Sequence, residues 1–142
     1  NMVKNGGFEA LEKLSAEAKK YIAPLPIDYE PDEEAAGMFG LMMMTSGKHT
    51  DPENVAKAQA LKDATMGWFI AQNLKSKFVH LNGNYHSDFK KGIITYLNKY
   101  RPGLKIATVC SVRQDDIKKL GEENEGRADF YICVPTDMTM TY

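Results

Sequence analysis

The chain has 142 residues, and its 43% hydrophobic content is enough to bury one ordinary core but not two. Its 18 basic and 19 acidic residues are interspersed and give a formal net charge of -1, which excludes the basic footprint of a nucleic-acid-binding protein. No apolar run reaches the roughly 18 to 20 residues that span a bilayer, and no signal peptide is visible. Cys110 and Cys133 lie in separate strand-like runs, so buried free thiols are expected rather than a disulfide.

Helical periodicity dominates the first part of the chain. Residues 8–22 place apolar side chains at helical spacing, and a proline-rich connector follows them. Asp32 can cap a second helix, whose nearly continuous apolar surface consists of Met38, Phe39, Leu41, Met42, Met43 and Met44. Such a surface is typical of core packing, and an apolar cofactor wall or a subunit contact is the alternative.

A third helix is expected over residues 52–74, with a proline just inside its start and Thr50 or Asp51 as its cap. One stripe of this helix carries Gln59, Asp63 and Met66. The stripe is polar at Gln59 and Asp63 and apolar at Met66, a pattern that would suit the rim of a pocket. The alternative is that the two polar side chains simply face solvent.

Beyond Lys75 the period of the apolar residues changes. The expected elements are strands at 77–82, 104–112 and 128–134 and helices at 87–100 and 115–120. This β-α-β-α-β order predicts right-handed parallel crossovers. Three strands are few for a parallel sheet that needs cover on both faces, so an oligomer or further polypeptide is expected to complete it.

The predicted fold class is therefore α/β, with a small parallel sheet of about three strands, flanking helices and an N-terminal helical subdomain. We assign residues 1–54 to the helical subdomain and residues 55–142 to the C-terminal part of a larger α/β domain, the two forming one folded unit.

A polar turn of four residues, Gly83, Asn84, Tyr85 and His86, follows the apolar run 78–81. In an open parallel sheet, ligands bind outside the carboxyl ends of the strands, so this turn would deliver a tyrosine and a histidine to a candidate site. The alternative is that the glycine and asparagine only make a tight turn and the histidine helps to cap the next helix.

Three segments together resemble the ChaN-type haem-binding lipoprotein family, which is similar at its motifs to the wider Tiki and erythromycin-esterase superfamily. They are QALKDATMGWFIAQNL, FVHLNGNYHSDFKKGIITYLNKYRPGLKIATV and GRADFYICVP. The resemblance spans about residues 55–135, and the preceding helices also fit the helical subdomain of such proteins. Its most specific pieces are Gln59, Asp63 and Met66, the turn Gly83 to His86, and Arg127, Ala128 and Asp129.

One signature of that family, a Gly-Glu turn followed by histidine, has no match in this chain. The nearest string, Gly47, Lys48 and His49, is one residue too short and lies between helices. Because family members resemble an α/β domain about twice this length, the resemblance implies a C-terminal segment. Its site would then be completed by a missing N-terminal segment or by a homo-oligomer.

The resemblance implies a non-catalytic haem-binding protein of iron acquisition, held in the cell envelope by a lipid anchor not present in this chain, with haem near a dimer interface. His86 is the first choice as the haem and metal ligand, and Tyr85 is the alternative axial ligand, because ferric haem accepts both donor types. Gln59 and Asp63 would orient a ligand through hydrogen bonds. The candidates for the haem propionates are Lys48, Lys62 and Lys90.

Two other functions stay open on the sequence. The wider superfamily includes metal-dependent hydrolases and proteases, but catalytic zinc needs three protein ligands, and His86 with Asp63 supplies two at most. The segment could also be an interaction module without a site. His80 lies within an expected strand and is interpreted as a core histidine.

Overall fold

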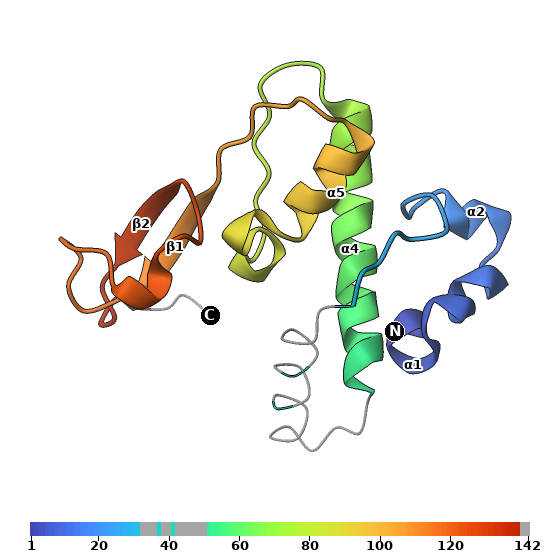
Figure 1. Cartoon of the computed structure of the whole chain (residues 1–142), viewed down its shortest axis with the longest axis horizontal. Coiled ribbons are helices and arrows are strands. Elements are labelled where there is room, and N and C mark those ends of the chain that lie inside the picture. The colour runs from blue at the N-terminus through green and yellow to red at the C-terminus, as the bar shows by residue number, and fades with distance from the viewer. Residues whose placement is uncertain (32–36, 38–40, 42–50, 140–142) are drawn as a thin grey trace. The chain divides into compact units, whose positions relative to one another are not determined.

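The structure is a computed structural model that describes residues 1–31, 37, 41 and 51–139. Its contacts divide the chain into a first unit, Asn1–Asn73, and a second unit, Leu74–Tyr142, and each unit is described by itself (Figure 1). The predicted methionine-rich surface lies outside the described residues except for Leu41, which is exposed. The predicted domain division after residue 54 stays a prediction.

The first unit is built on the long helix α4, Pro52–Asn73, as the sequence predicts. Asp51 caps it, because the amide of Glu53 donates to Asp51 Oδ1 at 3.0 Å. Helix α1, Met2–Gly6, packs against α4 (Figure 1). Buried apolar residues of this unit include Val3, Leu11, Ala23, Ile27, Val55, Ala56, Ala64, Ile70 and Ala71.

The helix expected over residues 8–22 is wrong as a single element. The structure has a 3-10 helix, η1, at Phe8–Lys13 and a short α2 at Ala16–Lys19. Leu14 between them is extended, with ψ 140°. The side chain of Ser15 accepts from the amide of Ala18 at 3.1 Å and so caps α2, which ends the first helix because the serine competes for backbone partners.

The second unit contains two parallel strands, β1 at Val109–Arg113 and β2 at Phe130–Val134, and the helix α5 at Ile93–Tyr100. In the ladder the partners are Val109 with Phe130, Cys110 with Tyr131, Ser111 with Ile132, Val112 with Cys133, and Arg113 with Val134. Three 3-10 helices lie in the connections, η2 at Asn84–His86, η3 at Asp88–Lys90 and η4 at Glu122–Asn124. The mixed α/β class and the parallel pairing are confirmed.

The expected third strand, residues 77–82, is not formed. This segment has no strand pairing, and its apolar side chains are exposed: Val79 by 83% and Leu81 by 89%. His80 is exposed too, so its interpretation as a core histidine is wrong. A strand preference acts through side-chain packing, and these side chains have little packing to stabilise a strand.

One face of the two-stranded sheet is also exposed. The register places Val109 and Ser111 of β1 beside Phe130 and Ile132 of β2, and all four side chains lie on the exposed face. The opposite face of β1 is buried, since Cys110 and Val112 alternate with the exposed residues. The sheet therefore shows apolar side chains on both faces, as parallel sheets do, with cover on one face of β1.

The two expected helices of this unit are corrected as well. The helix predicted over 87–100 begins only at Ile93, because Phe89, Lys90 and Gly92 have positive φ values of 56°, 57° and 56°. Residues 115–120 are not helical.

The buried side chain of Gln114 organises this loop instead of a helix. Its amide nitrogen donates to the carbonyls of Asp116 and, at 2.6 Å, Lys119, and its amide oxygen accepts from the amide of Gly121 at 3.2 Å.

We expect Gln114→Leu to open the loop 115–121, because it leaves the Lys119 carbonyl and the Gly121 amide without their partner. The local cost should be about 1 to 3 kcal/mol. Hydrogen exchange at the Gly121 amide measures this directly and should become faster. The exposed Gln72 of α4 supplies a control, since Gln72→Leu should leave that exchange unchanged. An unaltered Gly121 amide in Gln114→Leu would contradict the assignment.

Candidate functional site

The predicted ligand turn is a single 3-10 turn in the second unit. The amide of His86 donates to the carbonyl of Gly83 at 2.9 Å, and the amide of Ser87 donates to the carbonyl of Asn84 at 2.9 Å. Gly83 has an ordinary extended conformation, φ -67° and ψ 142°, and a Cβ placed there would meet no heavy atom within 4 Å. Neither backbone geometry nor a neighbouring atom therefore requires glycine at this position.

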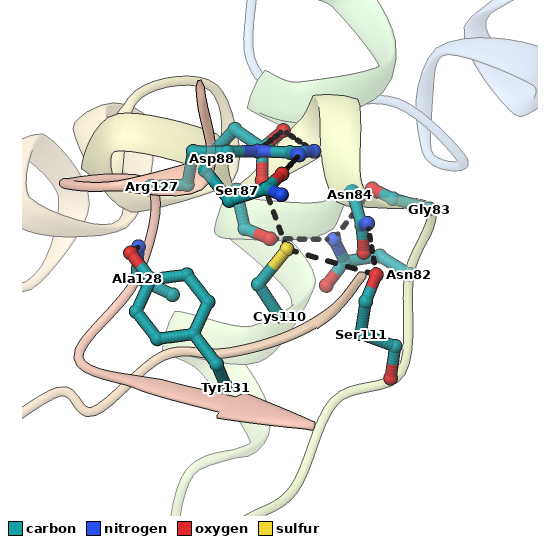
Figure 2. Close-up of polar contacts among 11 residues, drawn as sticks. Asn82, Gly83, Asn84, Ser87, Asp88, Cys110, Ser111, Arg127, Ala128 and Tyr131 are labelled. Carbon is teal, nitrogen blue, oxygen red and sulfur yellow. Dashed lines mark hydrogen bonds and ion pairs between the residues drawn. The ribbon is translucent and has the colours of Figure 1, made fainter. Parts of the chain in front are cut away.

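Two asparagines hold the turn in place. The side-chain amide of Asn82 donates to the Gly83 carbonyl at 2.9 Å and to Ser87 Oγ at 3.0 Å. The side-chain amide of Asn84 donates to the carbonyl of Ser111 at 2.9 Å, as Figure 2 shows. The turn is thereby attached to strand β1.

The Ser111 carbonyl lies on the edge of β1 that faces away from β2. On the β2 side, the Thr108 carbonyl accepts from Phe130 and the Gln114 amide donates to Val134. Because consecutive residues of a strand direct their backbone groups to opposite sides, the even-numbered residues face β2 and Ser111 faces the other edge. Asn84 thus has a structural hydrogen bond, and its predicted contact with a cofactor stays a prediction.

The two candidate ligands stand next to each other on this turn. The rings of Tyr85 and His86 are 5.6 Å apart between centroids and meet edge to face at 79°. Tyr85 is 40% exposed and His86 is partly buried. Both side chains are therefore at least partly accessible on an anchored turn.

The residue that follows the turn by two positions, Asp88, forms an ion pair with Arg127. Arg127 Nη2 and Nε donate to Asp88 Oδ2 at 2.7 and 3.1 Å (Figure 2). Arg127 Nη1 donates to Asn124 Oδ1 at 2.6 Å. The hydrogen bond to Asp88 raises the pKa of Arg127. The amide of Phe89 also donates to the Arg127 carbonyl at 2.8 Å.

A second ion pair lies beside the first. Lys90 Nζ is 2.6 Å from Asp129 Oδ1, while Asp129 Oδ2 accepts from the amide and the hydroxyl of Thr108 at 2.8 and 3.0 Å. The contact with Lys90, followed by the two hydrogen bonds from Thr108, lowers the pKa of Asp129 to about 2. Residues 88–90 are therefore connected to residues 127–129 at both ends, and we call this set of contacts the clamp.

The thiol of Cys110 completes the surroundings of Asp88. Cys110 is only 3% exposed, and its Sγ donates to Asp88 Oδ1 at 3.7 Å, opposite the oxygen that Arg127 uses (Figure 2). Burial raises the pKa of the Cys110 thiol. Cys110 and the half-buried Cys133 are both free thiols, so the expected burial holds for Cys110 alone.

The clamp holds an unfavourable stretch of backbone. Phe89 and Lys90 both have left-handed φ values, which cost roughly 1 to 3 kcal/mol at each non-glycine residue. Asp88 before them and Lys90 itself carry the two ion pairs. The contacts of the clamp therefore offset the strain of the segment that directly follows the turn.

The other predicted site residues belong to the first unit. Gln59, Asp63 and Met66 lie on α4, where Asp63 is buried and Gln59 Oε1 accepts from Lys62 Nζ at 3.0 Å. Their predicted contacts with a ligand stay predictions. Of the candidate propionate partners, Lys62 and Lys90 already contact Gln59 and Asp129, and Lys48 lies outside the described residues.

The described part of the chain contains neither a metal cluster nor a membrane-spanning helix. None of its His, Cys, Asp and Glu side chains gather in a group of three that could hold a metal ion. Within the same residues, no helix combines the length and the apolar character needed to cross a membrane.

Comparison with known proteins identifies the family. The fold defines a mixed α/β protein, and residues 1–97 match the family described as haem-binding uptake, Tiki superfamily, ChaN. The chain belongs to this family. The match includes the turn Gly83–His86 and extends further toward the N-terminus than the expected 55–135, but ends within α5, so Arg127 lies beyond it. No curated protein and no solved structure matches the chain.

Sequence reasoning missed Asp88, Asn82 and Thr108. Asp88 stands two residues after the histidine of the turn, which is a weak signal, and its partner Arg127 is 39 residues away. Only the spacing of the quoted family motifs, which brought Arg127 to attention, gave any indication of this contact.

We expect the Asp129 carboxyl to titrate near pH 2 rather than at its ordinary 3.8. Because the folded-state pKa is depressed, the stabilisation is fully present above a pH of about 4 and is lost as the pH falls through about 2. The carboxyl carbon shift of Asp129, followed by NMR, measures the midpoint. Lys90→Met should raise this midpoint, whereas Lys105→Met should not. A wild-type midpoint near 3.8 would contradict the clamp at Asp129.

Proposed function

We propose that this chain binds haem through the turn Gly83–His86 and acts as a non-catalytic protein of haem uptake. The observation that carries the proposal is the pairing of Tyr85 and His86 on one anchored, accessible turn. Family membership supports it, because the family is described as haem-binding uptake and its match includes the turn.

The donor set of the turn fits the axial positions of haem iron. Ferric haem takes a tyrosinate oxygen or an imidazole nitrogen as its protein ligand, and the bound haem would supply an iron centre held by one such donor. We expect one of the two side chains to ligate a given iron. We assign that role to His86 first, with Tyr85 as the alternative.

The surroundings of the turn fit an apolar macrocycle. Gly83 leaves open space where a side chain would otherwise project. Phe89, which follows the turn, is exposed, and so are the apolar residues 78, 79 and 81 that precede it. Exposed apolar side chains on both sides of the donor pair along the chain support a ligand site at this turn.

The anchoring of the turn supports binding energetically. Asn82 and Asn84 hold the backbone on both sides of the donor pair before any ligand arrives. Binding then costs less conformational entropy of the protein, which raises the affinity without any additional contact.

The finer parts of the proposal follow the family description. A role in iron acquisition in the cell envelope, a lipid anchor, and a dimer that shares haem belong to the proposal. Light scattering with and without haemin measures the last of these, and a haem-loaded monomer would argue against the dimer.

Haemin titration tests the ligand assignment. His86→Ala should shift the Soret band of bound haem and weaken binding by about 10-fold or more, as loss of a metal-site group does. Tyr85→Phe should do so instead if the phenol is the ligand. His80→Ala is the matched control, because His80 is an exposed histidine of the same unit. The assignment is wrong if neither turn variant changes the spectrum or affinity.

Substitution at Gly83 tests the open space above the turn. We expect Gly83→Ala to change stability by less than about 0.5 kcal/mol, since its φ is ordinary and no atom is near. Haemin affinity should fall, because a methyl group would occupy the space that the macrocycle needs.

A second glycine gives the opposite pattern as a control for Gly83. Gly103 has φ +83°, so Gly103→Ala should cost about 1 kcal/mol in thermal or denaturant unfolding and leave haemin affinity unchanged. Unchanged affinity in Gly83→Ala would show that haem does not approach this position.

A further inference from the structure

We infer that Asp88 and Arg127 are positioning residues for the haem-ligand turn, an inference that rests on the proposed function. The side chain of Arg127 donates hydrogen bonds to Asp88 and Asn124. It acts through Asp88, which fixes the chain immediately after Tyr85 and His86.

Few residues separate the two contacts that hold the turn, so the position of Asp88 directly affects the candidate ligands. Asn84 is held to the carbonyl of Ser111, and Asp88 is held to Arg127. Only Tyr85, His86 and Ser87 lie between these two anchors, and Asn82 also bonds the Ser87 hydroxyl. A displacement of Asp88 must therefore be absorbed within three residues, two of which are the candidate ligands.

The chemistry of Arg127 suits a fixed orientation better than a simple positive charge would. Its Nε and Nη2 both donate to one oxygen of Asp88, and its Nη1 is turned to Asn124. The planar guanidinium so holds the carboxylate in one orientation, which a lysine ammonium cannot reproduce. The two charged side chains are mostly buried, 23% and 18% exposed, so removing one leaves the other poorly compensated.

The ion pair stabilises a strained stretch of backbone directly after Asp88. Phe89 and Lys90 are both left-handed, and the Phe89 amide donates to the Arg127 carbonyl at 2.8 Å. Once the pair is broken, this strained segment can relax toward ordinary φ values, and the turn before it moves too. Loss of Arg127 should therefore alter how the ligand is presented, not only how tightly the unit folds.

Cys110 provides a readout that needs no haem. Its buried thiol lies against Asp88, so movement of Asp88 should expose it. In a Cys133→Ser background, Arg127→Met should raise the rate of Cys110 labelling by a disulfide reagent about 10-fold, and Arg127→Lys should give an intermediate rate. Arg113→Met is the matched control, because Arg113 donates to the carbonyls of Thr136 and Met138 instead.

The haem readout uses the same proteins. Arg127→Met should weaken haemin binding about 10-fold and shift the Soret band and the electron paramagnetic resonance signal of the iron. Asp88→Asn should do the same, and the double variant should be no worse than either single one, because both act on one contact. Arg113→Met should bind like the parent.

The outcomes separate the inference from the proposed function. If the parent binds no haemin, the proposed function fails, while the labelling rates still decide whether the pair holds the segment. If the parent binds and Arg127→Met binds with the same affinity and spectra, the positioning role is overturned. Should circular dichroism show Arg127→Met unfolded, the same comparison is decided by Arg127→Lys and Asp88→Asn, and parent-like spectra in both would overturn it.

Discussion

The ion pair between Asp88 and Arg127 is the contact on which the second unit depends. It joins segments 39 residues apart, and the hydrogen bond from Phe89 to the Arg127 carbonyl and the pair of Lys90 with Asp129 lie directly beside it. Because one face of the sheet is exposed, burial alone gives this unit less stabilisation than a covered sheet would have. Polar contacts between the turn segment and the start of β2 therefore carry an unusual share of its organisation.

Elements with local signals are the ones that could be predicted from the sequence. The long helix α4 has Pro52 inside its start and Asp51 as its cap, and the structure has both. Contacts between distant residues could not be predicted in this way. Nothing near Asp88 in the sequence indicates that it will meet Arg127, and Gln114 gives no sign that it will organise the loop after β1. The candidate ligands were found because both stand on one turn.

The errors of the prediction share a physical cause. Residues 77–82 and 104–107 have strand-like sequences, yet neither segment is paired. Their strand preference depends on neighbours that pack against them, whereas the helical preference of α4 is largely internal to the helix. The broken helix at Leu14 and the delayed start of α5 have a different origin. There, the Ser15 side chain bonds the backbone locally, and left-handed φ values at Phe89 and Lys90 interrupt the helical backbone.

The bond from Asn84 to Ser111 connects these unpaired segments with the candidate site. It contacts a carbonyl on the β1 edge opposite β2, so the turn lies where a further strand would otherwise pair. Both unpaired segments lie on the amino side of this one contact, 77–82 before Asn84 and 104–107 before Ser111. In the described residues the sheet has two strands, and the candidate ligand turn, rather than a third strand, contacts the other edge of β1.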